Sequence, residues 1–143
     1  MSITLGSRSL SRLEGVHPDL VRVVKRAAAS SDLDFTVLEG LRTEARQKQL
    51  FKQGATKTLN SRHITGHAVD LGAMLDGSVR WDWGLYFRLA EIVRMASIAE
   101  KVPIRWGGTW KLLSAIDGPI TAKNLSRSFP DGPHFELPRA SYP

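Results

Sequence analysis

Apolar residues recur at helical spacing in three stretches of the chain. The first stretch begins at Pro18, and proline suits the first position of a helix because it has no N–H to satisfy. One side of this helix would carry Leu20, Val21, Val24 and Ala28. The predicted helices cover residues 18–30, 43–54 and 82–102.

The two later stretches also carry signals for helix ends. Thr43 suits the N-cap of the second helix, because its hydroxyl can accept a backbone N–H, and Gly54 suits the end of that helix. Asp82 suits the N-cap of the third and longest helix. The apolar stripe of the third helix consists of Leu85, Leu89, Ile92, Val93 and Ala96.

Short apolar runs between and after these stretches predict strands. The runs are DFTVLEG (34–40), HAVDLGAM (67–74), PIRWGG (103–108) and HFEL (134–137). In the first run we expect Phe35, Val37 and Leu38 to face the core. DGSVRW is typical of a turn, and residues 109–133 read as a long connection of the kind that is usually functional or partly disordered. The order of the elements predicts an α+β fold in which a small antiparallel sheet carries three main helices.

The length of 143 residues is that of one typical domain, and the hydrophobic share of 42% is sufficient for a core. We therefore expect a single compact domain over residues 1–143, with a core at about 15–137 and a short C-terminal tail. The chain contains no cysteine, which excludes disulfides, zinc–thiolate sites and thiol nucleophiles.

The net charge of +6 attracts polyanions such as nucleic acids, anionic cell-wall polymers and acidic lipids. The basic residues are scattered, however, and the densest cluster, VRVVKRAAA, reads as the solvent face of a helix. Because no zinc-finger, RNP or KH signature accompanies them, we do not expect nucleic-acid binding. The start of the chain lacks a run of signal-peptide type, and no stretch approaches the roughly 20 apolar residues of a membrane span. We expect synthesis in the cytoplasm and no stable membrane insertion.

The segment SRHITGHAVD, residues 61–70, contains candidate metal ligands. On a helix His63, His67 and Asp70 would share one face, but Gly66 and the β-branched residues around it argue against a helix. On a strand Asp70 points to one face and His67 to the other. His63 arrives from the preceding loop and can reach the side of Asp70. The segment therefore predicts His63 and Asp70 as ligands and leaves His67 out.

A catalytic zinc usually takes three protein ligands, and DGPHFEL supplies His134 as the third candidate. The turn before it presents Asp131, which can serve as the base for the water that the metal activates. Glu136 is a rival base, on the same strand face as His134, or else a partner that orients a ligand. The remaining histidine, His17, merely precedes the proline that starts a helix.

Four motifs together resemble the M15 zinc peptidases. SRHITGHAVDL is similar to the SxHxxGxAxD motif of that family, and DGPHFEL to its (D/E)xxH motif. LEGLRTEARQKQLFKQG resembles the upstream GxRTxxxQ segment, and IRWGGTW the WGGDW segment. The similarity extends over roughly residues 15–137 and is strongest to the compact phage endolysins of the L-alanyl-D-glutamate peptidase type.

The resemblance implies one Zn²⁺ held by His63, Asp70 and His134. It implies Asp131 as the catalytic base and Arg42 as the cation that stabilises the oxyanion. The residues that it implies in substrate binding are Ser61, Trp106 and Trp110. One position departs from the family, since Thr109 stands where the family often has Asp, and this leaves specificity open.

The implied function is hydrolysis of the L-Ala–D-Glu bond in peptidoglycan by a monomeric phage endolysin. A holin-type membrane-permeabilising protein would give it access to the wall. One alternative keeps the chemistry and changes the bond, as in a D,D-carboxypeptidase or dipeptidase that acts on D-Ala-D-Ala. The other is a non-catalytic basic module that binds a polyanion.

Overall fold

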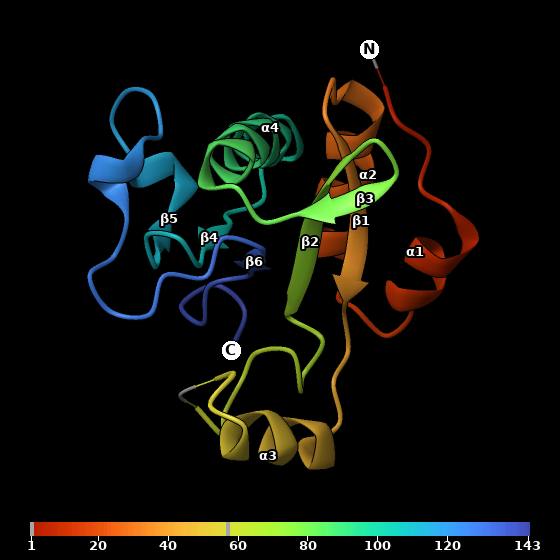
Figure 1. Ribbon diagram of the computed structural model, residues 1–143, viewed down its shortest axis with the longest axis vertical. Coiled ribbons are helices and arrows are strands. Elements are labelled where there is room, and N and C mark those ends of the chain that lie inside the picture. Colours follow the sequence, from red (N-terminus) through yellow and green to blue (C-terminus); the bar gives the residue numbers. More distant parts are fainter. Residues whose placement is uncertain (1, 57) are drawn as a thin grey trace.

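The computed structural model describes residues 2–56 and 58–143, and these residues form an antiparallel sheet with helices packed against it (Figure 1). The helices in the described residues are α1 (Ser7–Arg12), α2 (Pro18–Ser30), α3 (Glu44–Lys52) and α4 (Trp83–Glu100). The strands are β1 (Asp34–Glu39), β2 (Ala68–Leu75), β3 (Ser78–Arg80), β4 (Arg105–Trp106), β5 (Lys111–Leu112) and β6 (His134–Glu136). The predicted α+β class with a small antiparallel sheet is confirmed.

The sheet brings distant parts of the chain together around β2. Its strand order is β1-β2-β6-β4-β5, and β3 pairs with the far end of β2. The last strand, β6, therefore inserts between β2 and β4, although about 60 residues separate it from β2 in the sequence. Val69, Leu71 and Ala73, which alternate along β2 and so share one face of the sheet, are completely buried.

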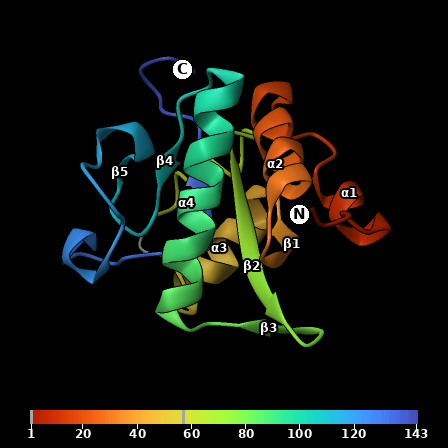
Figure 2. The ribbon, with the colours of Figure 1, turned by 90° about the horizontal axis from the view of Figure 1, so that it is seen from above.

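The two longest helices, α2 and α4, lie side by side against the sheet (Figure 2). The residues of α2 that were expected to face the core, Leu20, Val24 and Ala28, are buried at helical spacing. In α4 Leu89 and Val93 are buried as expected, whereas Leu85 and Ile92 are only partly buried, as is Val21 in α2. In β1 the expected Phe35 and Val37 are buried and Leu38 is only partly covered. The core list is thus right at its centre and too wide at its edges.

The helix ends follow the capping signals in part. The Thr43 hydroxyl accepts the N–H of Arg46 at 3.1 Å and starts α3, while Gly54 follows that helix with a φ of +75°. Asp82 stands at the N-cap of α4, but its side chain makes no capping hydrogen bond and instead pairs with Arg80. α3 lies apart from the other helices, beyond the ends of β1 and β2 (Figure 1).

Several elements carry no periodic pattern and were not predicted. The helix α1 has the polar sequence SRSLSR and is held on β1 by Ser9, whose hydroxyl lies 3.0 Å from that of Thr36. DGSVRW contains the strand β3 as well as a turn. The connection at 109–133 contains β5 and two 3₁₀ turns, Leu113–Ala115 and Ala122–Asn124. These elements depend on partners elsewhere in the chain, so local sequence does not reveal them.

The residues outside 15–137 also pack on the core. Leu13 is buried, and the C-terminal Tyr142 donates from its hydroxyl to Asp19 at 2.6 Å. Arg62 donates to the carbonyls of Leu137 and Tyr142, which holds the tail against the turn before β2. Within the described residues no helix is long and apolar enough to cross a membrane.

Candidate metal centre

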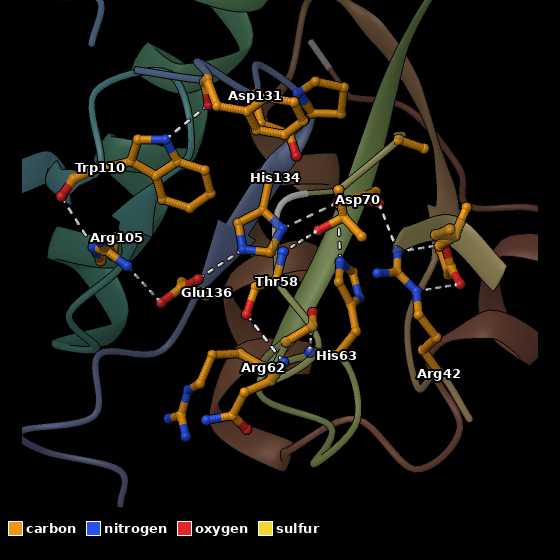
Figure 3. Close-up of a pocket in the computed structure, with 18 of the residues that line it drawn as sticks. Arg42, Thr58, Arg62, His63, Asp70, Arg105, Trp110, Asp131, His134 and Glu136 are labelled. Atoms are coloured by element: carbon orange, nitrogen blue, oxygen red, sulfur yellow. Dashed lines mark hydrogen bonds and ion pairs between the residues drawn. The ribbon is translucent and has the colours of Figure 1, made fainter. Parts of the chain in front are cut away.

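Asp70 lies at the centre of a cluster with His63 and His134. In the pairing of β2 with β6, Asp70 is directly opposite His134, so both side chains leave the same face of the sheet. Asp70 Oδ1 lies 3.1 Å from His63 Nε2 and 3.3 Å from His134 Nδ1. One ligand atom from each residue falls within 4.8 Å of the others, and Figure 3 shows both rings turned toward the carboxylate. This spacing suits three ligands of one ion.

His63 is positioned by the tight turn that precedes β2. Its backbone N–H donates to Ser61 Oγ at 3.1 Å, and its ring Nδ1 lies 2.8 Å from the carbonyl of Gly40. A carbonyl oxygen only accepts hydrogen bonds, so Nδ1 is the donor to Gly40 and Nε2 is the nitrogen that faces Asp70. Gly66 completes the turn with a φ of +76°, and a Cβ there would come within 2.3 Å of the carbonyl of Gly15. Only glycine fits this position.

His134 is oriented by Glu136 on the side away from Asp70. Its Nε2 lies 2.7 Å from Glu136 Oε1, which leaves Nδ1 to face the cluster. Arg105 holds the other oxygen of Glu136 at 3.2 Å. A carboxylate on the outer nitrogen of a ligating histidine fixes its tautomer and makes it a better ligand. The sequence left two roles open for Glu136, a base or a partner that orients a ligand. Its hydrogen bond to His134 corresponds to the second role.

The charges in the cluster are mutually stabilised. Burial opposes the charge of Asp70, but His63 and His134 outweigh it and hold the pKa of the Asp70 carboxyl well below its ordinary value. Burial likewise opposes the imidazolium of His134, but hydrogen bonds to Asp70 and Glu136 raise its pKa to about 9. A divalent cation would replace this imidazolium as the positive partner of Asp70. Two nitrogens with fixed outer hydrogen bonds and one carboxylate oxygen fit a zinc-type ion.

The three cluster residues line a cavity of about 820 Å³, and Asp131 lines the same cavity. Its backbone N–H donates to the carbonyl of Gly107 at 2.9 Å. A Cβ on Gly107 would come within 2.3 Å of the carbonyl of Asp131, so the Gly-Gly turn is what allows this close approach. Burial, followed by the negative charge of Asp70, raises the pKa of the Asp131 carboxyl. A half-buried carboxyl of raised pKa beside a metal cluster is suited to proton transfer.

Arg42 reaches the cavity from the start of α3 and is almost completely buried. Its guanidinium binds both oxygens of Glu39 at 2.7 Å and Gln47 Oε1 at 2.7 Å. A remaining N–H group lies 3.5 Å from Asp70 Oδ2. Burial disfavours the cation, but Glu39 and then Asp70 raise the pKa of Arg42. Sequence reasoning assigned no role to Glu39 or Gln47, although Gln47 is the last residue of the GxRTxxxQ motif.

The aromatic and hydroxyl residues expected to contact substrate lie in different places. Trp110 lines the cavity, with its ring centroid 5.3 Å from that of His134 and its Nε1 donating to the carbonyl of Phe129. Ser61 also lines the cavity, and its hydroxyl accepts the N–H of His63. The structure does not place Trp106 on the wall. Trp106 is completely buried, and its Nε1 donates to the carbonyl of Gly132. This hydrogen bond anchors the turn before His134 to the core.

Thr109 is buried and is absent from the cavity lining. Its hydroxyl accepts the N–H of Lys111 at 3.2 Å and braces the turn that carries Trp110. An aspartate could accept the same hydrogen bond. The departure from the family pattern therefore falls on a turn and not on a cavity wall.

One protein-family model matches nearly the whole chain. The family model described as phage L-alanyl-D-glutamate peptidase covers residues 1–138. The chain belongs to this family.

The sequences of two relatives and the structure of a third can be aligned with most of this chain. The L-alanyl-D-glutamate peptidase of Escherichia phage T5 is 30% identical over 141 residues, which are 96% of this chain and 99% of the phage protein. The peptidoglycan L-alanyl-D-glutamate endopeptidase CwlK of Bacillus subtilis (strain 168) is 31% identical over 80% of this chain and 66% of its own length. The solved structure of the L-Ala D-Glu endopeptidase ChiX of Serratia marcescens is 42% identical and covers 96% of this chain and 91% of its own, with a TM-score of 0.80. The fold of this chain is therefore that of a known endopeptidase.

Proposed function

We propose that this chain is a zinc-dependent peptidoglycan endopeptidase that hydrolyses the L-Ala–D-Glu bond of the stem peptide. The observation that carries the proposal is the convergence of His63, Asp70 and His134 beside Asp131, in a cavity of about 820 Å³. Membership of the L-alanyl-D-glutamate peptidase family supports the identity of the bond.

The residues that would hold the ion are His63 through Nε2, Asp70 through its carboxylate and His134 through Nδ1. A zinc ion supplies Lewis acidity, which polarises a carbonyl and lowers the pKa of a water to about 7. The outer hydrogen bonds to Gly40 and Glu136 keep both imidazoles aimed at one point, so little reorganisation accompanies binding of the ion.

Asp131 is the proposed general base. It accepts the proton of the attacking water and passes it to the amine of D-Glu as the peptide bond breaks. Its raised pKa favours this exchange, because a carboxyl whose pKa lies nearer to the working pH can both accept and return a proton. Glu136 is a poorer candidate, because its two oxygens already bind His134 and Arg105.

Arg42 is the proposed oxyanion partner. Glu39 and Gln47 fix its guanidinium at the cavity wall, so its charge is already in place when the carbonyl oxygen becomes negative. Ser61 and Trp110 are the proposed substrate contacts on the described wall, while Trp106 supports them from the core.

In the proposed biological role the protein is a phage endolysin that lyses the host. It is made in the host cytoplasm, acts as a monomer and reaches the wall after a holin-type protein has opened the membrane. The names of relatives from Escherichia phage T5 and Listeria phage A118 support this role. The net charge of +6 favours approach to an anionic wall.

The decisive experiment is digestion of purified Gram-negative peptidoglycan with the zinc-loaded protein, followed by mass spectrometry of the new chain ends. We expect chelator-sensitive release of peptides that begin at D-Glu, with L-Ala left on the glycan. Release of free D-Ala would instead assign the protein to the D,D-carboxypeptidases. Absence of cleavage at every metal concentration would refute both enzyme assignments and favour the binding module.

A further inference from the structure

A second, smaller hollow of about 270 Å³ adjoins the cavity of the metal cluster. Three of its residues, Trp81, Asp131 and Pro133, also line the main cavity. The rest of its lining consists of Trp83, Tyr86, Pro130 and Gly132. The two hollows therefore adjoin at these three residues, one of which is the proposed base Asp131.

The indoles of this hollow are unusually open to solvent. Trp81 is 63% exposed and Trp83 is 37% exposed, although tryptophan is highly buried in most proteins. Exposed apolar surface that adjoins a cavity marks a binding site more often than isolated exposed residues do. The indoles lie at the N-terminus of α4, on the connection that leads from β3.

Two neighbouring rings, the buried Tyr86 and the partly buried Phe87, hold the indoles in place. Trp81 lies parallel to Tyr86, with an angle of 5° between the planes and 6.1 Å between the centroids. Tyr86 is itself fixed, because its hydroxyl donates to the carbonyl of Arg80 at 2.6 Å and accepts the N–H of Ala73. Trp83 stacks on Phe87 with centroids 5.8 Å apart. A ligand would thus meet surfaces that are already ordered, which lowers the entropic cost of binding.

The chemistry of the lining selects an uncharged ligand with an apolar face. Among the described residues that line the hollow none is basic, so nothing there would attract an anion. Aromatic faces carry negative charge density and attract the slightly positive C–H groups of a sugar ring. The carboxylate of Asp131 adds an acceptor for a hydroxyl or amide group at one end.

We propose that Trp81 and Trp83 form a sugar-binding subsite for the glycan strand of peptidoglycan. The inference rests on the proposed function, because in peptidoglycan the L-Ala of the stem peptide is attached directly to a muramic acid residue. When the bond after L-Ala lies at the metal cluster, that sugar is only one residue away, at roughly 3.5 Å per residue of extended chain. The adjoining hollow is at the right place to receive it.

The test compares two substrates that contain the same scissile bond. One is the free stem tetrapeptide and the other is the same peptide attached to its disaccharide. The readout is the ratio of kcat/KM for the glycosylated substrate to kcat/KM for the free peptide. In Trp81→Ala and Trp83→Ala we expect this ratio to fall roughly 10-fold, and Trp81→Phe should restore most of it.

Met95→Ala is the matched control, because Met95 is 68% exposed on the same helix but lies outside both hollows. Its ratio should equal that of the wild type. If Trp81→Ala and Trp83→Ala reduce kcat/KM equally for both substrates, the ratio stays constant and the sugar subsite is refuted.

A binding experiment separates this inference from the proposed function. The probe is the disaccharide with L-alanine amide, which contains no bond for the enzyme to cut. In His134→Ala, which is expected to be inactive, the indole N–H signals of Trp81 and Trp83 should still shift in NMR spectra as this probe is added. Unmoved signals would overturn the subsite even if peptidoglycan is cleaved. Shifted signals in a protein that cleaves nothing would retain the subsite and reject the peptidase.

Discussion

The protein contains two pairs of neighbouring histidines with opposite properties. In the cluster pair, His63 and His134, the ring centroids are 5.0 Å apart, and in the outer pair, His17 and His67, they are 5.7 Å apart. Asp70 bonds to both rings of the cluster pair, whereas among the described residues no carboxylate bonds to a ring of the outer pair. Distance alone therefore does not make a metal site. What distinguishes the cluster pair is the carboxylate of Asp70, which contacts both of its rings.

The difference also appears in proton affinity. Hydrogen bonds to Asp70 and Glu136 raise the pKa of His134 to about 9, in spite of its burial. Burial, and then the positive charge of Arg62, lowers the pKa of His67. The surroundings of His134 thus favour its charged form, whereas those of His67 favour its neutral form. His67 directly precedes β2, and strand alternation directs its side chain to the face opposite Asp70. One short segment, residues 63–70, therefore contributes a histidine to each pair.

The largest expected effect comes from removing a ring of the cluster pair. His63→Ala and His134→Ala should lose the metal and lose activity by more than the roughly 10–100-fold that partners outside the ligand set cost. His67→Ala is the matched control and should keep both. Metal content by mass spectrometry and peptidoglycan turnover provide the measurements. A zinc-replete His134→Ala protein with normal turnover would show that the cluster is not the catalytic metal site.

Asp131→Asn should separate metal binding from proton transfer. The amide cannot accept the proton of water, so we expect turnover to fall about 10²–10⁴-fold while the metal content stays at the wild-type level. If Glu136→Gln produced this combination and Asp131→Asn did not, the base would be Glu136.

Glu136→Gln tests the partner that orients His134. Glutamine keeps an acceptor oxygen but loses the charge, so metal affinity should fall roughly 10–100-fold, and turnover should recover at high zinc concentration. Competition with a chelator of known affinity measures the change. Glu100→Gln, which alters a surface ion pair with Arg22 and Arg26, is the control. Equal affinities in the two variants would contradict an orienting role.

In metal-stripped protein His134 and His67 should make stability respond to pH in opposite directions. The pKa of His134 is raised in the folded state, so its contribution to stability is complete below about pH 6.5 and is lost as pH rises toward about 9. The pKa of His67 is lowered, so its contribution is present above about pH 6.5 and is lost as pH falls. Thermal unfolding midpoints across this range measure the slopes. His134→Gln should flatten the alkaline decline, and an unchanged decline would contradict the assignment.

The smallest effect is expected at His17, whose Nδ1 accepts the N–H of Asp19 at 3.0 Å and caps α2. His17→Ala should lower the free energy of unfolding by about 0.5–2 kcal/mol, and His17→Asn should restore most of it, since asparagine is a good N-cap. Urea titration measures both. A change of metal affinity in either variant would mean that the two pairs are coupled.

Local pattern was sufficient for the elements that carry their own signal. The helices α2, α3 and α4 have apolar stripes or caps that are visible over a single stretch, and each lies within a few residues of its predicted range. The parity of side chains along β2 was enough to separate His67 from Asp70. The family motifs brought in Arg42, whose position in the sequence resembles that of any charge near a helix start.

Other features depended on contacts between distant residues. The short α1 exists because Ser9 and Arg12 bond to β1, and the position of Trp106 inside the core follows from β4 pairing with β6. Glu39 and Gln47 lie only 3 and 5 residues from Arg42, but their hydrogen bonds to its guanidinium depend on how the chain turns from β1 into α3. The sugar subsite likewise needs Trp81 and Trp83 to meet the turn at 130–133.

Residue types and their spacing along the chain were enough to nominate the ligands, since the parity of a strand and the chemistry of imidazole and carboxylate are local properties. That Nε2 of His63 faces Asp70 follows from the carbonyl of Gly40, and that His134 lies opposite Asp70 follows from the β2–β6 register. Those partners lie 23 to 64 residues away in the sequence (Gly40 to His63, Asp70 to His134), and no local pattern encodes such pairings. Packing of the whole sheet is what brings them within hydrogen-bonding distance.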